Sequence, residues 1–160
     1  MWDISLGLGI SALPIRSSLV LFCTLGFTEL VNVSGSDTSS IYTTSDLEGL
    51  AYADFHFADV LSTASEAAAI VEALGPVGMQ GIKRAVLHTA ACLRERRKVM
   101  VFCHLGVGRS PAVSTMALML ARQCSAEEAV QVVLRLRPKA IINDAVLAFA
   151  KKFCDEWVVG

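Results

Sequence analysis

The chain has 160 residues and a formal net charge of −1; 54% of the residues are hydrophobic and 18% are charged. At roughly 100–200 residues per domain, this length predicts one domain over residues 1–160. The apolar fraction excludes disorder, and the near-neutral charge argues against nucleic acid as a partner, because binding it requires clustered cations. The mean hydropathy is +0.55, yet Pro14 and Arg16 break the most apolar stretch, residues 4–28, so no membrane span is expected.

The amino terminus does not have the pattern of a secretory leader, because Asp3 is its only early charge where a basic segment would stand. We therefore expect a cytoplasmic protein. The cysteines are odd in number and widely spaced, at Cys23, Cys92, Cys103, Cys124 and Cys154. No C-x-x-C pair occurs, and we place only His104, beside Cys103, at ligand spacing, so neither a disulfide framework nor a zinc site is expected. The four cysteines other than Cys103 fall within apolar helical stretches and are expected to be small buried residues.

The first third of the chain predicts strands separated by a helix and a long loop. The strands are expected at residues 4–8, 29–33 and 51–57, the helix at 16–25, and a surface loop rich in Ser and Thr at 34–45. Gly26 ends the helix. In the third strand Tyr52, Asp54 and His56 alternate with apolar residues, which predicts a strand with one polar face.

The rest of the chain is mostly helical around one buried strand. Helices are expected from residue 62 to a break at Gly75–Pro76, over 80–96, from Ser110–Pro111 onward, over 125–137 and over 143–157; the strand is expected at 99–102 and a glycine-containing turn at 103–109. Ser125 and Glu128 have the spacing of a capping box. Strands alternating with helices predict an α/β fold with a mostly parallel central sheet of about 4–5 strands flanked by helices.

The turn after the buried strand has the composition of an oxyanion site. Sites in α/β sheets lie at the carboxyl ends of strands, where Cys103 stands six residues before Arg109. The loop is formed by His104, Leu105, Gly106, Val107, Gly108 and Arg109. Its backbone N–H groups and the following helix N-terminus can surround a tetrahedral anion and favour a thiolate. We expect Cys103 to attack phosphorus while Arg109 binds the phosphoryl oxygens.

Expelling the leaving group requires a proton donor. Asp59 is our choice, because it follows a strand at a turn that can reach over the loop; Asp54, within the strand, is the alternative. The Ser110 hydroxyl can hydrogen-bond the Cys103 sulfur and ease its departure, or it can cap the following helix. His104 either shapes access to the site or is a solvated side chain without a role.

The segment C-H-L-G-V-G-R-S resembles the C-x-x-G-x-x-R-S signature of cysteine-dependent protein phosphatases, in particular the compact dual-specificity group. The similarity spans residues 2–157 and extends to Asp59, Val31-Asn32-Val33, Arg137-Pro138 and Asn143. It implies hydrolysis of phosphotyrosine in phosphorylated proteins, with neither a metal ion nor a cofactor, and it leaves open whether phosphoserine and phosphothreonine are also substrates. It also allows Asn143 to brace the phosphate loop, although the residue reads most simply as a helix cap.

One position departs from that family. Its members usually carry a histidine immediately before the nucleophile, where it orders the loop, and this chain has Phe102. A catalytically weak, phosphate-binding scaffold is therefore the alternative function. A nucleotide-binding reading of Gly106-Val107-Gly108 ranks last, because Pro111 stands where a third glycine is required.

Two other features of the sequence, a basic cluster and a histidine, are interpreted as structural. The basic cluster of Arg94, Arg96, Arg97 and Lys98 falls where a helix should end and fits the negative end of the helix dipole, with a docking patch as the alternative. His88, within the expected helix 80–96, is read as structural rather than catalytic.

Overall fold

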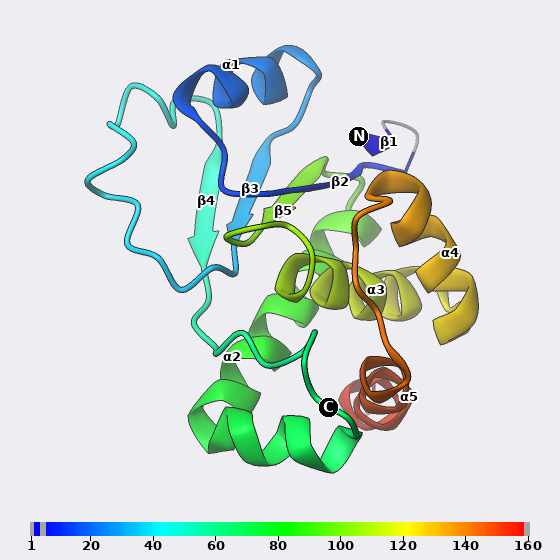
Figure 1. Ribbon diagram of the computed structural model, residues 1–160. Coiled ribbons are helices and arrows are strands. Elements are labelled where there is room, and N and C mark those ends of the chain that lie inside the picture. The colour runs from blue at the N-terminus through cyan, green and yellow to red at the C-terminus, as the bar shows by residue number, and fades with distance from the viewer. Residues whose placement is uncertain (1, 4–5, 159–160) are drawn as a thin grey trace.

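A computed structural model describes residues 2–3 and 6–158 and confirms the α/β prediction (Figure 1). In chain order its elements are β1 (Trp2–Asp3), β2 (Leu8–Ser11), α1 (Arg16–Thr24), β3 (Glu29–Asn32), β4 (Ala51–Asp54), α2 (Ala67–Arg94), β5 (Val99–Phe102), α3 (Arg109–Arg122), α4 (Ala126–Leu136) and α5 (Asp144–Val158). Within the described ranges, none of the helices has the length and apolar character needed to cross a membrane.

The strands form one five-stranded sheet in the order β1-β2-β5-β3-β4. β2, β5, β3 and β4 are parallel, and β1 is an antiparallel edge strand, which confirms the mostly parallel sheet. The central strand β5 is fully buried, as its continuous apolar run predicts.

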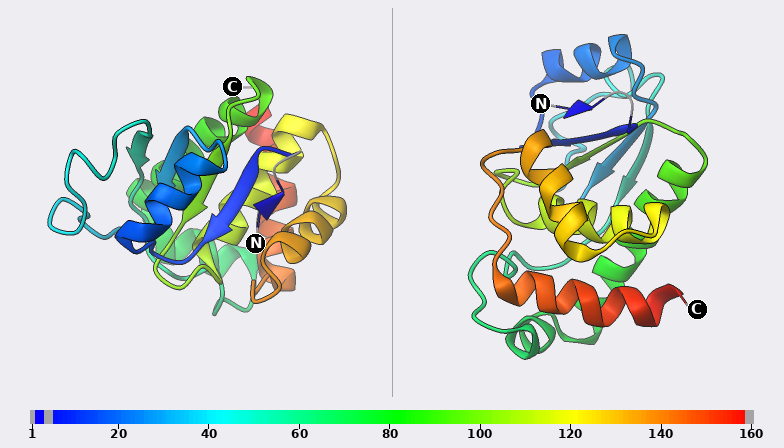
Figure 2. Two further views of the ribbon diagram at one scale, coloured as in Figure 1. Left: turned by 90° about the horizontal axis from the view of Figure 1, so that it is seen from above. Right: turned by 90° about the vertical axis from the view of Figure 1, so that its right-hand side faces the viewer.

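Helices cover both faces of the sheet unequally (Figures 1 and 2). α1 covers one face alone, whereas α2, α3, α4 and α5 lie on the other. Successive residues of β5 point to opposite faces, so Met100 and Phe102 join the smaller core with Leu19 and Phe22 of α1. The neighbours Val99 and Val101 join the larger core under the four other helices.

Two expected strands have different bounds. The one expected at residues 4–8 falls partly on residues 4–5, outside the described part of the chain, and the strand that follows is β2. The strand expected to end at Phe57 ends at Asp54, because β4 is an edge strand and the ladder closes with a bond from Phe55 N to the end of β3. Beyond it the chain runs against α2, where a Cβ at Gly81 would lie 2.3 Å from the His56 carbonyl oxygen.

The helix before β5 also differs from expectation. It begins at Ala67 rather than at residue 62; the break expected at Gly75–Pro76 is present, but the second helical segment resumes at Pro76 rather than at residue 80. Gly75 supplies the kink with φ 65° and ψ 178°, a backbone conformation that glycine tolerates. Pro76 then begins the second helical segment, where its missing N–H is not needed.

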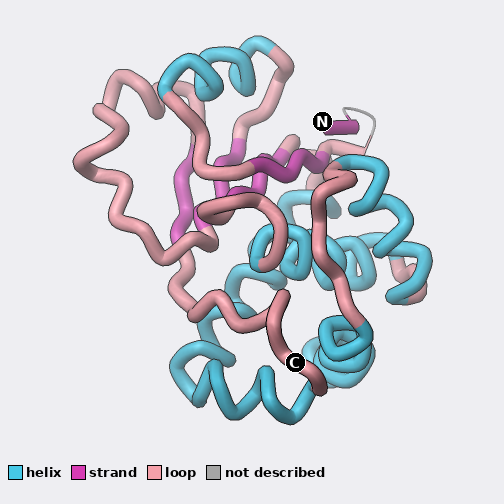
Figure 3. The backbone as a smooth tube through the Cα atoms, in the orientation of Figure 1, coloured by secondary structure: helices cyan, strands magenta, loops and turns pink. Residues whose placement is uncertain are grey.

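The long connection between β3 and β4 is fixed to the α1 side of the molecule. The Tyr42 hydroxyl donates a hydrogen bond to the Pro14 carbonyl, and burial raises the pKa of Tyr42 to about 12, so it remains a donor. Arg16 forms two hydrogen bonds with the Asp46 carboxylate, at 2.9 and 3.1 Å. The surface loop predicted at 34–45 therefore has a defined path, without helix or strand (Figure 3).

Candidate active site

Cys103 lies directly after β5 with its sulfur inside the loop that follows. The residue is 3% exposed. Its Sγ accepts a hydrogen bond from Gly106 N at 3.2 Å and lies 3.2 Å from Ser110 Oγ. The structure thus brings Ser110 to the sulfur. The alternative reading of Ser110 as the helix cap is wrong, because Gly108 occupies the N-cap of α3 and no side chain caps that end.

The backbone carbonyl groups of the loop point outward, to partners in other parts of the protein. Four of its carbonyls accept hydrogen bonds from outside the loop: His104 O from Leu13 N at 3.1 Å, Leu105 O from Arg137 Nη2 at 3.1 Å, Gly106 O from Arg137 Nε at 3.2 Å, and Val107 O from Ile141 N at 2.7 Å. In a trans peptide the next N–H points the opposite way. The N–H groups of residues 105–108 therefore point away from these outer partners, toward the inside of the loop, where Gly106 N reaches the Cys103 sulfur.

These contacts order the loop although Phe102 replaces the usual histidine. The Phe102 side chain is fully buried and packs in the smaller core, where it forms no polar contact with the loop. Arg137, at the end of α4, binds two consecutive loop carbonyls instead. Sequence reasoning noted Arg137 as part of the family resemblance but did not predict this contact.

Gly106 fits a site that a larger residue would disrupt. Its φ is 72°, in the left-handed region. A Cβ there would lie 2.7 Å from Ala12 N and 2.8 Å from the carbonyl carbon of Ser11. The glycine therefore allows the loop to lie directly against the end of β2.

Arg109 is hydrogen-bonded on one side and forms only a long ion pair with Asp59 on the other. It is 8% exposed, and its Nη1 donates a 2.5 Å hydrogen bond to Ser34 O. Its buried Nε has no hydrogen-bonding partner among the described residues, and Asp59 Oδ1, at 3.8 Å, is too distant to accept one. Because an unpaired buried donor is costly, this Nε is suited to an anion that binds beside it.

Asn32, the last residue of β3, positions the carbonyl that holds Arg109. Its Oδ1 accepts hydrogen bonds from Ser34 N at 2.8 Å and Ser34 Oγ at 2.6 Å. Its Nδ2 donates to Ser36 O at 3.0 Å and to Tyr52 Oη at 2.9 Å. Sequence reasoning missed this role. The available signal was an asparagine at a strand end with serine two residues on, the pattern of an Asx-turn.

The two candidate acids lie in different places. Asp59 stands beside the loop, since a Cβ on Gly108 would be 3.3 Å from its Oδ1. Asp54 lies at the end of the edge strand β4, with its Oδ1 3.8 Å from His56 Nε2. The geometry therefore favours Asp59 as the acid over the alternative.

Two further predicted residues lie at the margin of the site. His104 has an exposed side chain. Asn143 caps α5, because its Oδ1 accepts from Val146 N at 3.0 Å, and its Nδ2 donates to Ala64 O at 3.2 Å. Asn143 thus braces the segment that follows Asp59, not the phosphate loop that the resemblance allowed.

The other cysteines differ more than their sequence context suggested. Cys92 and Cys154 are buried, and this burial raises the pKa of the Cys92 thiol to about 11 and that of Cys154 to about 12, so neither is a nucleophile. The expectation that all four non-nucleophilic cysteines lie buried in helices is wrong for two of them. Cys23 is exposed on α1, and Cys124 lies half-buried in the connection between α3 and α4.

Several solved structures share the whole fold. Tk-PTP in its active form is 23% identical, with 97% of this chain and 99% of that chain covered and a TM-score of 0.69. Human DUSP28 is 20% identical, with coverage of 98% and 96% and a TM-score of 0.70. The human tyrosine phosphatase-like serine/threonine/tyrosine-interacting protein is 14% identical, with the same coverage and a TM-score of 0.71. No protein-family model and no curated protein sequence matches the chain. The chain has the fold of tyrosine and dual-specificity phosphatases, as the sequence resemblance implied.

Proposed function

We propose that this chain is a phosphomonoester hydrolase that dephosphorylates proteins at phosphotyrosine through a phosphocysteine intermediate. The observation that carries the proposal is the placement of the Cys103 sulfur among inward N–H groups, next to a buried Arg109 whose Nε has no hydrogen-bond partner among the described residues and lies 3.8 Å from Asp59 Oδ1. Donors that converge on one point beside a nucleophile match the charge of a phosphoryl group in transfer. The shared phosphatase fold supports the same conclusion, and we propose that residues 1–160 act as one catalytic domain.

The first step transfers the phosphoryl group to the enzyme. The Cys103 thiolate attacks phosphorus in line, so an S–P bond forms while the P–O bond to the leaving group breaks. Arg109 and the N–H groups of residues 105–108 bind the three equatorial oxygens. Asp59 gives its proton to the leaving oxygen, so that an alcohol or phenol departs rather than its anion.

The second step releases phosphate. The Asp59 carboxylate takes a proton from a water molecule as that water attacks phosphorus, and the S–P bond breaks. The electron pair returns to Cys103 Sγ, which leaves as a thiolate. Ser110 Oγ, 3.2 Å away, donates a hydrogen bond to that sulfur and thereby eases its departure.

A direct test compares the parent protein with Cys103→Ser. We expect the parent to hydrolyse an aryl phosphate and phosphotyrosine peptides, to be inhibited by vanadate, and to release a burst of product under rapid mixing. Cys103→Ser should be inactive, whereas Cys23→Ser, at an exposed cysteine, should retain full activity. Equal activity in Cys103→Ser and the parent would refute the nucleophile. Phosphoserine and phosphothreonine peptides in the same panel distinguish tyrosine-only from dual specificity.

Phe102 favours a second candidate, a phosphate-binding scaffold with little turnover. In that case the Arg109 side and the inward N–H groups still bind vanadate, but no burst of product follows at any pH. Phe102→His separates the two functions. A large gain of turnover in this variant would indicate that the natural chain is a scaffold, and an unchanged rate would indicate that Arg137 already orders the loop.

A further inference from the structure

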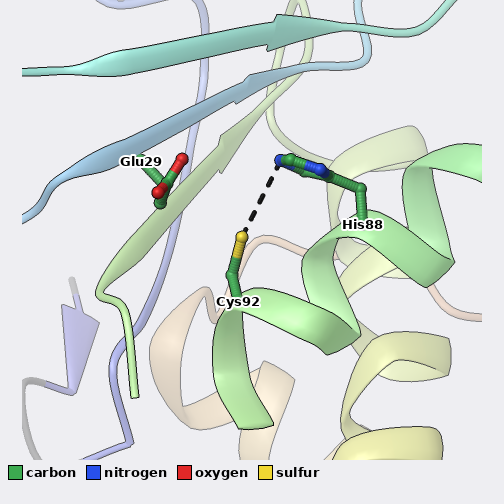
Figure 4. A group of neighbouring side chains, drawn as sticks. All are labelled: Glu29, His88 and Cys92. Atoms are coloured by element: carbon green, nitrogen blue, oxygen red, sulfur yellow. Dashed lines mark hydrogen bonds between the residues drawn. The ribbon is translucent and has the colours of Figure 1, made fainter. Parts of the chain in front are cut away.

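A second cluster of reactive side chains lies at the amino end of the sheet, at the opposite strand ends from Cys103 (Figure 4). Glu29 is the first residue of β3, whereas His88 and Cys92 lie one turn apart on α2. One ligand atom of each residue lies within 4.8 Å of the other two. This pair runs against the expectation that only His104 lies at ligand spacing and that no zinc site forms, because a spacing of four residues puts two side chains on one face of a helix.

The distances suit a tetrahedral metal centre. His88 Nε2 and Cys92 Sγ are 3.7 Å apart. With Zn–S about 2.3 Å and Zn–N about 2.0–2.1 Å, the two ligands of a tetrahedral zinc ion stand roughly 3.5 Å apart. His88 and Cys92 therefore require a shift of only a few tenths of an ångström to share one ion, and a carboxylate oxygen of Glu29, on the sheet, lies within 4.8 Å of both ligand atoms.

Burial and charge agree with a cation between these groups. Cys92 is fully buried and Glu29 is 6% exposed. Arg97 Nη1 donates to Glu29 Oε1 at 2.6 Å, which holds the carboxylate in place beside the other two ligands. An outer partner of this kind is common for carboxylates that bind metals. Arg97 itself is partly exposed and marks the solvent side of the cluster.

We propose that Glu29, His88 and Cys92 bind one divalent transition-metal ion of the zinc class, with water as the fourth ligand. A thiolate, an imidazole and a carboxylate select zinc or cobalt over magnesium or calcium. On binding, the Cys92 thiol releases its proton to solvent and the two anionic ligands neutralise the ion. The ion would link α2 to β3 far from the reacting sulfur, so this proposal does not depend on the proposed phosphatase activity.

The test uses full-length protein carrying Cys103→Ser, which removes the thiol of the candidate active site as a competing ligand. Cobalt(II) is titrated into metal-free protein and the thiolate-to-cobalt absorption band is followed, with zinc stoichiometry measured separately. We expect one ion per chain. The band should disappear in Cys92→Ser, and apparent affinity should fall by more than tenfold in His88→Gln. Cys124→Ser and His104→Gln serve as matched controls that retain the band.

Two outcomes would overturn the proposal: no saturable band in the parent, or a band that survives in both Cys92→Ser and His88→Gln. Either would mean that Cys92 and His88 form only a buried S–H···N contact. If Cys92→Ser does not fold, thermal unfolding of His88→Gln and Glu29→Gln, with and without zinc, tests the site instead. Zinc should raise the midpoint temperature of thermal unfolding of the parent but not of these two variants. Equal shifts of this midpoint in all three proteins would refute the site.

Discussion

The two ends of the central strands carry polar groups of opposite kind. At the carboxyl end, the loop after β5 directs N–H groups and the Arg109 guanidinium inward, and these groups attract an anion. At the amino end, the side chains that face one another are a carboxylate, a thiol and an imidazole, which are ligands for a cation. The same strand β3 serves both, through Asn32 at one end and Glu29 at the other. A buried polar group requires a partner, so the kind of groups gathered at each end indicates what each end can bind.

The largest expected effect concerns Arg109. Arg109→Lys keeps the charge but loses the planar fork that binds two phosphoryl oxygens, so kcat/KM for an aryl phosphate should fall by about 10³-fold. Arg122→Lys, at the far end of α3, should have wild-type kinetics. Comparable losses in both variants would mean that Arg109 acts only through general charge.

The next effect distinguishes the two acids. Asp59→Asn should slow hydrolysis of alkyl phosphates by about 10²-fold, and substrates with good leaving groups much less. It should also flatten the fall in rate at high pH, because that fall reflects loss of the proton that the acid donates. Asp54→Asn is the matched variant, and a pH–rate profile altered by Asp54→Asn alone would assign the role to Asp54.

A smaller effect is expected at Arg137, which holds the loop after β5 in place. Arg137→Ala removes two hydrogen bonds to loop carbonyls, and a loop displaced by a fraction of an ångström should lower kcat by roughly tenfold. The exposed Arg135, on the same helix, provides the control variant Arg135→Ala. Unchanged kcat in Arg137→Ala would show that the backbone bonds from Leu13 and Ile141 suffice.

The smallest effect is expected for Arg97, at the amino end of the sheet. Arg97→Met leaves the Glu29 carboxylate buried without its partner and should lower the free energy of unfolding by about 1 kcal/mol at neutral pH. Because the reacting groups lie at the other end of the sheet, kcat should not change. Denaturant unfolding in metal-free buffer and steady-state kinetics measure both, with Arg96→Met as control. A clear loss of kcat would show that the two ends are coupled.

Sequence patterns predicted those parts of the molecule that depend on near neighbours. The apolar run of β5, the Gly26 stop after α1 and the cap at Ser125, whose Oγ accepts from Glu128 N, each follow from a few consecutive residues. The placement of Ser110 beside the sulfur follows in the same way, since one short loop and one helix start fix both.

The contacts that the sequence did not reveal join distant segments. Arg109 meets a carbonyl 75 residues earlier, and Arg137 reaches back 31 residues to Gly106. Glu29 and Arg97 are 68 residues apart. The sequence around these residues does not indicate their partners, because the order of the strands in the sheet determines which strand ends lie together. The break at Gly75 shows a related limit: the pattern located the break, but not that the helix resumes directly at Pro76.

The position of β5 between β2 and β3 determines the order in which this chain can fold. β2 and β3 each bind β5 along its whole length, with Leu8 and Glu29 both in register with Val99, and neither binds the other. Among the described strands, the β1–β2 and β3–β4 pairs can form before residue 99 has been synthesised, but the two pairs cannot be joined into one sheet until β5 follows. A ribosome-bound chain therefore exposes the edges of β2 and β3 until late, and contacts of such long sequence separation slow folding. Variants in β5 should for this reason affect the folding rate more than variants in the edge strands.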